Sequence, residues 1–482
     1  MTSCDQCLHK SQKLVLARAW GFKSPLPHHI SLGIFAGMQK ERTTVSSSHR
    51  FKNILCLVSV ALIASTAEAL GSVAQEDSGA AVAIHAGRVI DGLSAAPLGP
   101  SIILVEGGRI TEVGPDVVIP AGAQEINLSD ATVLPGLIDA HTHVLFAPQD
   151  GKNPVLEKSV AFRTLEAAAA ARLSLEAGFT TLRDTDSEGA DFADVAVRDA
   201  IADGLIPGPR LLVSTMALSI TGGHMNHVGL APAIDQRVPQ LAVMTDTVDE
   251  MIREVRRQVK YGADWIKLYA TGTMRHVDRH TLQSLAQVDE EQVRAVVEEA
   301  RRWRRDVAAH AYGGDGARAA VLGGVRSLEH GLLLEEDVLE LMAERGTYWA
   351  ATLSNFTRST GLAGYPDDFV DRLRSRHAEA FRTALRLGVN IVFGTDAGRV
   401  PHGSNAGEFE LMVGLGMSPM QAIQSATSVA AELLRLENEI GAVKPGFLAD
   451  LIAVDGNPLD DIGLLKNVAF VMKGGVVVKE TK

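Results

Sequence analysis

The sequence predicts an α/β protein: a (β/α)8 barrel with a small β-sandwich domain built from both chain ends. Between residues 136 and 440, short apolar runs alternate with amphipathic stretches of helical length, a pattern typical of parallel α/β folds. About eight strand–helix units fit this region, as a (β/α)8 barrel requires. Residues 82–135 and 441–482 instead contain short apolar runs broken by glycine-rich turns, which is strand composition. A doubly wound parallel sheet is the alternative for the central region.

A stretch near the N-terminus has the parts of a secretory signal peptide in their usual order. Two basic residues, Arg50 and Lys52, precede an apolar run at 54–64 that is too short for a comfortable membrane span. Ala67-Glu68-Ala69 then supplies a cleavage site of the A-x-A type. We therefore expect export to the periplasm or the exterior, with cleavage near Ala69 and no membrane segment in the mature protein. An uncleaved anchor and a chance apolar run are the alternatives.

The remaining boundaries follow from that signal. A start at Met38 gives the signal peptide an ordinary length, so we interpret 38–69 as the signal peptide and 1–37 as a wrongly assigned upstream extension. Residues 70–81 form a linker. The β-sandwich is then assigned to 82–135 and 441–482, and the barrel to 136–440.

Composition and charge exclude several classes of protein. Of the 482 residues, 46% are hydrophobic, which is ample for a large core. From residue 70 onward, 38 Lys or Arg stand against 55 Asp or Glu. So acidic a body lacks the basic face that nucleic-acid binding needs. The three cysteines, Cys4, Cys7 and Cys56, all precede that body, which therefore has neither disulfides nor cysteine metal ligands.

Two histidines at the end of the first central strand are the first sign of a metal site. His141 and His143 follow an apolar run, two positions apart. Because residues two apart in a strand point to the same face, both imidazoles would point toward one spot. Histidine is the commonest protein ligand for zinc-like metals. Such a pair also arises by chance, so it does not decide the matter alone.

Four more polar residues end later predicted strands. Lys267, His310, His330 and Asp396 each stand at the carboxyl end of an apolar run. In a barrel, these ends meet on the face that carries active sites. Each residue has a structural explanation of its own: a core histidine, a solvated lysine, or an aspartate that caps a helix. Together with the histidine pair, they predict one shared metal site.

The motifs around these residues resemble those of the amidohydrolase superfamily, in particular its imidazolonepropionase-related, Xaa-Pro dipeptidase-like branch. The resemblance covers about residues 82–480, and the set of motifs is highly specific. It is carried by PGLIDAHTH at 135–143, WIKL at 265–268, HAY at 310–312, EHG at 329–331, GTDAG at 394–398 and GAVKPGFLAD at 441–450.

The resemblance implies a metal-bearing (β/α)8 barrel, a β-sandwich built from both ends, and two divalent metal ions. The implied ligands are His141, His143 and Asp396 for one ion, His310 and His330 for the other, and Lys267 as a bridge after carbon dioxide has converted it to a carbamate. A free ammonium beside two cations would be repelled, and an anionic carbamate removes that conflict. Zinc is the default for a histidine-rich site, although Mn, Co and Ni accept the same ligands.

Two metal ions with nitrogen and oxygen ligands predict hydrolysis. A metal-bridging hydroxide would attack an amide carbonyl, and a metal ion would polarise that carbonyl and stabilise the oxyanion. Asp396 is the candidate that accepts the proton of the water and returns it to the leaving amine. The predicted strand ends contain no Gly-x-Ser-x-Gly nucleophile elbow.

Three residues are candidates for contact with the substrate. His224, in the glycine-rich loop at 221–227, could donate a hydrogen bond to the substrate carbonyl, and Tyr312 could face the carbonyl or a carboxylate. Arg399, just past the strand that carries Asp396, could bind a C-terminal carboxylate. An ordinary loop residue in solvent is the alternative explanation for His224 and for Arg399.

We therefore expect an exported amidohydrolase that cleaves the amide bond to an amino acid in a small molecule, either a dipeptide or an N-acyl amino acid. The resemblance adds ochratoxin A, which would give phenylalanine and ochratoxin alpha, as a candidate substrate, and a homo-oligomer as the expected assembly. Carbamates, ureas and lactones are alternative substrates, because the same hydroxide would attack all of them. A deaminase with one metal ion is a further alternative, although the presence of Lys267 is evidence against it. So is a non-catalytic scaffold.

Overall fold

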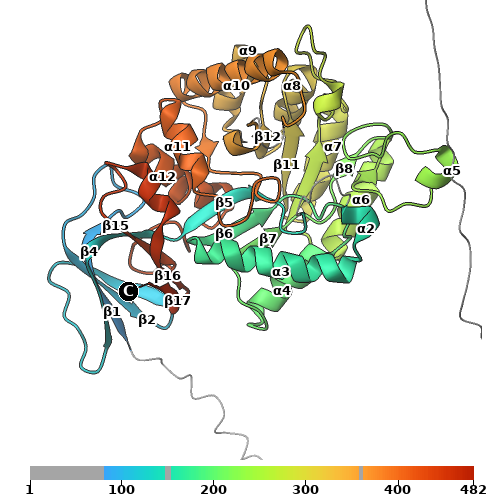
Figure 1. Cartoon of the computed structure of the whole chain (residues 1–482). Coiled ribbons are helices and arrows are strands. Elements are labelled where there is room, and N and C mark those ends of the chain that lie inside the picture. Colours follow the sequence, from blue (N-terminus) through green and yellow to red (C-terminus); the bar gives the residue numbers. More distant parts are fainter. Residues whose placement is uncertain (1–80, 147–153, 358–361, 482) are drawn as a thin grey trace, which may run out of the picture. The chain divides into compact units, whose positions relative to one another are not determined.

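The computed structural model describes residues 81–146, 154–357 and 362–481. From Asp77 to Lys482 the chain forms one unit, in which strands and helices are mixed (Figure 1). The upstream extension, the signal peptide, the three cysteines and all of the linker but its last residue lie outside the described residues, so they stay predictions. None of the described helices combines the length and the apolar character that crossing a membrane requires.

Strands from both chain ends share one seven-stranded sheet, drawn in blue and red in Figure 1. Its order is β17-β16-β15-β4-β1-β2-β3, and antiparallel pairing of β15 with β4 joins the C-terminal to the N-terminal strands. Because these strands form a single hydrogen-bonded sheet, the two-layered sandwich stays a prediction. The bounds are β1 Val82–Val89, β2 Ser101–Glu106, β3 Arg109–Gly114, β4 Gln124–Pro135, β15 Leu451–Asp455, β16 Val468–Lys473 and β17 Val476–Glu480.

The two glycine-rich turns of this sheet contact each other. A Cβ atom on Gly108 would lie 2.7 Å from the carbonyl oxygen of Gly474, so only glycine fits there. Both residues also have positive φ, 76° and 56°, which glycine adopts without strain. The carboxylate of Asp450 fixes the contact, because it accepts hydrogen bonds from the backbone N–H of Gly474 at 2.7 Å and from Arg210 at 2.6 Å.

The central strands run parallel in two further sheets. The larger has the order β14-β13-β12-β11-β10-β8-β9 and the smaller β5-β6-β7. From β10 to β14 the order follows the chain without the reversal that a doubly wound sheet requires. The bounds are β5 Leu137–Thr142, β6 Phe179–Asp184, β7 Arg210–Val213, β8 Leu218–Ser219, β9 Val243–Met244, β10 Trp265–Tyr269, β11 Asp306–Ala311, β12 Ser327–His330, β13 Tyr348–Ala350 and β14 Ile391–Val392.

The α/β class is confirmed, but the described strands do not close into one continuous barrel sheet. Scattered backbone hydrogen bonds, and an isolated parallel bridge between Thr142 and Ala397, connect the two sheets instead. Ala140 N donates to Phe393 O at 3.0 Å, and Asp264 N donates to Val213 O at 2.8 Å. The shortness of β14, which has two residues, explains why a ladder does not form beside β5. The (β/α)8 barrel therefore stays a prediction.

Helices follow most of the central strands and pack against them through apolar faces. In α7, the buried residues Val293, Val296, Val297 and Ala300 recur at helical spacing. Asp289 and Gln292 cap its first turn with a reciprocal pair of hydrogen bonds. The helices are α2 Pro154–Glu157, α3 Val160–Glu176, α4 Ala193–Ala202, α5 Pro232–Asp235, α6 Val248–Lys260, α7 Glu290–Arg302, α8 Gly314–Gly323, α9 Glu336–Arg345, α10 Asp367–Leu387, α11 Gly407–Gly414, α12 Pro419–Ser425 and α13 Ser428–Leu433.

Candidate functional site

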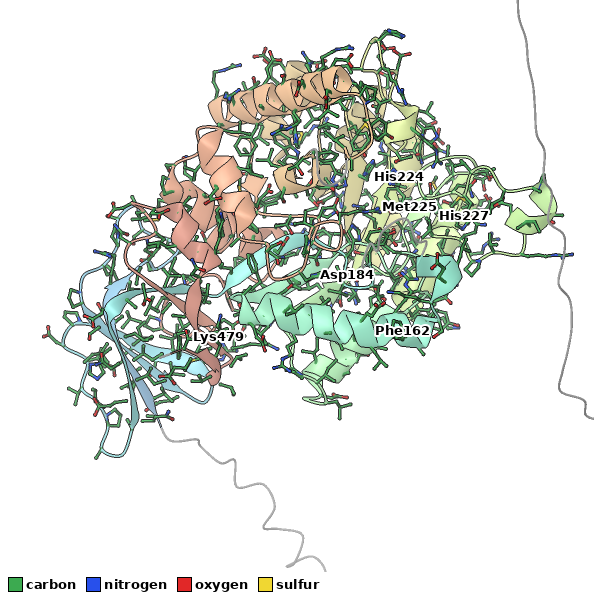
Figure 2. All side chains as sticks on the ribbon, in the orientation of Figure 1. Phe162, Asp184, His224, Met225, His227 and Lys479 are labelled. Carbon is green, nitrogen blue, oxygen red and sulfur yellow. The ribbon has the colours of Figure 1, made fainter. Side chains whose placement is uncertain are left out.

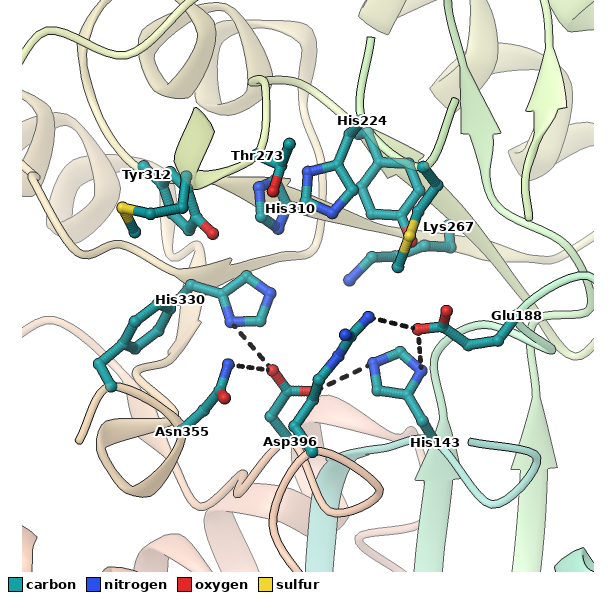
Figure 3. A pocket seen from close by; sticks show the side chains of 15 residues that line it. His143, Glu188, His224, Lys267, Thr273, His310, Tyr312, His330, Asn355 and Asp396 are labelled. Atoms are coloured by element: carbon teal, nitrogen blue, oxygen red, sulfur yellow. Dashed lines mark hydrogen bonds and ion pairs between the residues drawn. The ribbon is translucent and has the colours of Figure 1, made fainter. Parts of the chain in front are cut away.

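The six residues predicted as metal ligands come from five strand ends and lie close together. His141 belongs to β5, Lys267 to β10, His310 to β11 and His330 to β12. His143 follows β5 and Asp396 follows β14, and all six are buried. Five of them line one pocket, which Figure 3 shows from close by.

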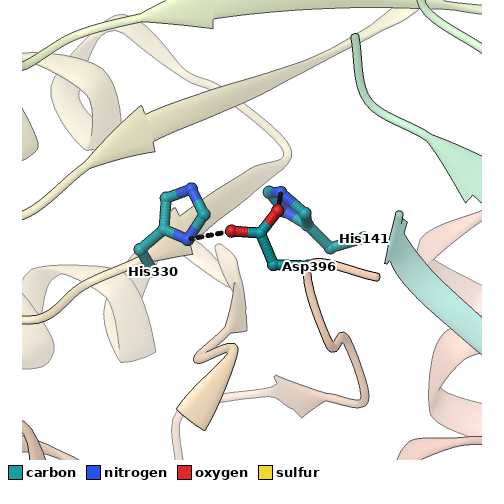
Figure 4. Close-up of side chains that lie close together, drawn as sticks. All are labelled: His141, His330 and Asp396. Atoms are coloured by element: carbon teal, nitrogen blue, oxygen red, sulfur yellow. Dashed lines mark ion pairs between the residues drawn. The ribbon is translucent and has the colours of Figure 1, made fainter. Parts of the chain in front are cut away.

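His141, His330 and Asp396 form the tightest group of this set (Figure 4). Each offers a ligand atom, and these atoms all lie within 4.8 Å of one another. Nε2 of His141 lies 3.7 Å from Oδ1 of Asp396, and Nε2 of His143 lies 3.1 Å from the same oxygen. Nitrogen and carboxylate ligands so placed suit a divalent metal ion such as zinc.

Two buried nitrogens of the group lack a hydrogen-bond partner among the described residues. They are Nε2 of His141 and Nζ of Lys267, whose residue is only 1% exposed. A buried polar atom without a partner costs free energy, and a bound ion or a modification of the side chain would remove that cost. The donor set therefore fits both a metal ion at His141 and a modified Lys267.

Burial sets the protonation of most of these groups. It lowers the pKa of His141, His310 and His330 well below the usual value and so favours their neutral form. Neutral imidazole is the form that binds metal ions. Burial likewise lowers the pKa of Lys267. For His143, burial is outweighed by the hydrogen bond and charge of Asp396, which raise its pKa to about 9.

Two of the candidate ligands have a strained backbone. His330 and Asp396 have φ of 74° and 61°, in the left-handed region that side chains other than glycine seldom adopt. The carbonyl oxygen of His330 accepts hydrogen bonds from Trp349 Nε1 and His377 Nε2, both at 3.1 Å. Thr352 Oγ1 lies 2.8 Å from Nδ1 of His330 and fixes its ring. Such strain is typical of functional sites.

Asp139 connects the strand of His141 to the turn of Asp396. Its carboxylate accepts hydrogen bonds from Thr395 Oγ1 at 2.6 Å and from Asn405 Nδ2 at 2.7 Å. On the other side of Asp396, Asn355 Nδ2 donates to Oδ2 at 2.6 Å. Asn355 thus orients the carboxylate of Asp396, and Asp139 fixes the turn that carries it.

The candidate substrate residues His224, Tyr312 and Arg399 all line the same pocket. The ring of His224 stacks on Tyr269, with centroids 4.2 Å apart and an interplanar angle of 17°. His224 is buried, whereas His227 of the same loop contacts the carbonyl of Pro239 (both labelled in Figure 2). The Tyr312 ring lies 4.7 Å from that of His310, on the side of the pocket opposite Glu188 (Figure 3).

Arg399 donates a hydrogen bond from Nη2 to Glu188 Oε1 at 3.0 Å, which sequence reasoning did not anticipate. Glu188 follows β6 after a run of polar residues, and its position gives no periodic signal. Arg275, by contrast, donates to the carbonyls of Gly223 and Asn226 and so braces the His224 loop. The pocket therefore contains one acidic residue beyond the predicted set.

Comparison with known families and structures agrees with this geometry. The Amidohydrolase family matches residues 132–478. Ochratoxinase from Aspergillus niger is 33% identical over 440 residues, which cover 84% of this chain and 88% of that protein. Its crystal structure superimposes with a TM-score of 0.74 at 29% identity, covering 84% of this chain and 96% of the other. A crystal structure of a Xaa-Pro dipeptidase with methionine bound in its active site superimposes with a TM-score of 0.75 at 34% identity, covering 83% of this chain and 100% of the other.

Proposed function

Because this chain belongs to the amidohydrolase family and is a hydrolase of carbon–nitrogen bonds, we propose that it cleaves the amide bond to an amino acid with two bound divalent metal ions. The substrate is a small molecule: a dipeptide or an N-acyl amino acid. The ochratoxinase and Xaa-Pro dipeptidase relatives support this choice, because the names of both refer to substrates in which an amide joins an amino acid to a second group.

One observation carries the proposal: the amine of Lys267 is buried among histidines and a carboxylate with no hydrogen-bond partner in the described part of the chain. An unmodified amine at this position would lose its hydrogen bonds to water on folding and form none in return. As a carbamate it would bridge two ions. His141, His143 and Asp396 would hold the first ion, and His310 and His330 the second.

The bound ions would supply a hydroxide at neutral pH and polarise the carbonyl. Side chains of this protein transfer the proton and bind the substrate. Asp396, oriented by Asn355, takes the proton of the attacking water and delivers it to the leaving amine. His224, stacked on Tyr269 and in tilted contact with His310, donates to the substrate carbonyl, and Tyr312 faces the substrate from the opposite wall. Arg399 offers its remaining N–H groups to a substrate carboxylate.

The proposal includes the assembly and the location of the enzyme. Backbone hydrogen bonds join both edges of the smaller parallel sheet to the larger one, which supports a barrel-like arrangement. The sheet shared by both chain ends supports a small β domain. The signal-like stretch at 38–69 supports export with cleavage near Ala69. The homo-oligomer rests on the family resemblance.

The test is a substrate panel together with a metal count. The full chain and a form that begins at Leu70 are assayed for amino-acid release from dipeptides, N-acyl amino acids and ochratoxin A, and metal per chain is measured. We expect about two ions and release of a free amino acid, which Asp396→Asn reduces by roughly 10²–10⁴-fold while the protein stays folded. An unchanged rate in that variant would contradict the proton-transfer role.

The alternatives predict different results in the same assay. About two ions without amide cleavage would direct the search to carbamates, ureas and lactones. About one ion per chain, with ammonia released from an amino-substituted ring, would indicate a deaminase instead.

A further inference from the structure

Glu188 lines the pocket, and one oxygen of its carboxylate is buried without a hydrogen-bond partner in the described part of the chain. The residue is 1% exposed and lines the pocket beside His143, Lys267 and Arg399. Its Oε1 lies 3.0 Å from Arg399 Nη2 and 3.7 Å from His143 Nδ1. Its Oε2 has no hydrogen-bond partner among the described residues. In Figure 3 this second oxygen points away from the two dashed contacts.

The position of Glu188 is held by buried groups. Its φ is 52°, and its backbone N–H donates to Asp186 Oδ1 at 2.9 Å. Arg163, itself 1% exposed, donates to the carbonyl of Glu188 at 2.7 Å and to that of Leu145 at 3.0 Å. A carboxylate held in a strained loop by buried hydrogen bonds is preorganised, as binding groups are.

A buried carboxylate oxygen without a donor costs free energy, so a ligand that supplies the donor gains that free energy on binding. Arg399 balances the charge of Glu188 through Oε1 and leaves Oε2 to a hydrogen-bond donor. An ammonium group is the donor that gains most from a carboxylate, because the hydrogen bond is charge-assisted.

The distance between Glu188 and the reacting groups decides which ammonium group of a substrate Glu188 can bind. Glu188 Oε1 lies 3.7 Å from His143, whose Nε2 lies 3.1 Å from Asp396 Oδ1. The α-ammonium of a dipeptide is two bonds from the carbonyl carbon that is attacked, so its receptor must lie this close. The cation of a lysine or arginine side chain would reach several bonds farther. The opposite wall, with Tyr312 and Phe356, suits an apolar part of the substrate.

We propose that Oε2 of Glu188 binds the α-ammonium group of an unblocked dipeptide, and that the enzyme therefore prefers dipeptides to N-acyl amino acids. The inference rests on the proposed amide hydrolysis and narrows its substrate class. Glu188 thus determines specificity and takes no part in proton transfer.

A matched pair of substrates tests it. Alanyl-phenylalanine and N-acetyl-alanyl-phenylalanine contain the same scissile bond and release the same phenylalanine, but only the first has an α-ammonium. We expect Glu188→Gln to lower kcat/KM for the free dipeptide roughly ten- to hundredfold and to leave the acetylated substrate within about threefold. Glu298→Gln, an exposed position on α7, should change neither value.

Three results would overturn the proposal. If Glu188→Gln lowered kcat/KM equally for both substrates, the role of Glu188 would be to position His143. If it lowered kcat/KM for neither, water would be the hydrogen-bond donor to Oε2. A metal content below that of the wild type would assign Glu188 to the metal site.

Binding without turnover separates this inference from the proposed function. Calorimetry with a ketomethylene isostere of the dipeptide, free or acetylated at its amine, should show tighter binding of the free form by the wild type and loss of that preference in Glu188→Gln. If the wild type cleaves neither substrate, amide hydrolysis fails as the function, and the isosteres still decide the role of Glu188. Equal binding of both isosteres by the wild type would reject it.

Discussion

Nδ1 of His141 lies 2.7 Å from Oε2 of Glu329, although the two residues are 188 positions apart in the chain. Both side chains are fully buried. Arg183 Nη2 donates to the other oxygen of Glu329 at 2.9 Å, so the carboxylate is an acceptor on both sides. His141 therefore carries its proton on Nδ1 and presents a free Nε2 toward Asp396, as a metal ligand must.

Glu329→Gln should weaken metal binding without removing a ligand. Only one of the two terminal atoms of the amide is an acceptor, so either His141 or Arg183 then faces an N–H group. We expect metal affinity, measured by competition with a chelator, to fall roughly 10–100-fold. Glu299→Gln is the control, since it removes another buried carboxylate, on α7, that pairs with Arg256 away from the pocket. Equal affinity in both variants would show that Glu329 serves stability alone.

Lys267→Ala should remove the bridge that we propose between two metal ions. We expect fewer than two ions per chain and a loss of activity above about hundredfold, because a ligand contributes more than the groups around it. Native mass spectrometry of the wild type should show the added mass of one carbon dioxide, absent from the variant. Lys260→Ala, exposed at the end of α6, should behave as wild type. Two ions and full activity in Lys267→Ala would exclude the bridging carbamate.

The residues at strand ends could be predicted from the sequence, because the apolar runs before them show where each strand ends. His141, His310 and His330 lie at the ends of β5, β11 and β12, where the apolar runs place them. The turn that carries Asp396 was predicted as part of a strand, but the strand stops at Val392. A left-handed backbone at Asp396 is a tertiary feature with no sequence signal.

The residues that sequence reasoning missed act across long separations. Glu329 was visible only as part of a motif, because its contact with His141 depends on how β5 and β12 face each other. Glu188 reaches the pocket through an irregular loop, and its partner Arg399 follows 211 positions later. The pairing between β14 and β5 could not be predicted for a related reason: a strand as short as β14 leaves few groups with which to form a ladder.

Gly331→Ala should displace His330. Gly331 has φ of 62°, and a Cβ there would lie 2.4 Å from Trp349 Nε1, the atom that donates to the carbonyl of His330. Gly346 is the matched control, with φ of 67° and open space around its Cβ position. Both alanines incur about 1–2 kcal/mol of left-handed strain, and only the first also meets a steric clash.

We expect Gly331→Ala to unfold at a lower denaturant concentration than Gly346→Ala and to bind metal more weakly, whereas Gly346→Ala keeps wild-type metal affinity. The measurements are urea unfolding and chelator competition. Equal stability of the two variants would show that Trp349 moves aside without cost.

Glu408 should make the stability of the protein depend on pH. The residue is 1% exposed on α11, and it accepts the backbone N–H groups of Leu353 at 2.8 Å and Ser354 at 2.7 Å. Burial outweighs these hydrogen bonds and raises the pKa of Glu408 to about 7. The folded protein therefore holds a proton that the unfolded chain releases above about pH 4.5.

A folded-state pKa above the unfolded value gives a stabilisation that is complete below the unfolded pKa and is lost as pH rises through about 7. Between pH 5 and pH 8 the wild type should lose about 2 kcal/mol of unfolding free energy that Glu408→Gln, which cannot titrate, does not lose. The variant is less stable overall, because the two N–H groups bond to different oxygens of Glu408 and an amide has an acceptor at only one of these positions. The slope with pH is therefore the readout. Urea unfolding at four pH values measures it. Glu410→Gln, exposed on the same helix, should keep the wild-type slope, and the same slope in Glu408→Gln would show that Glu408 ionises in the fold as freely as in water.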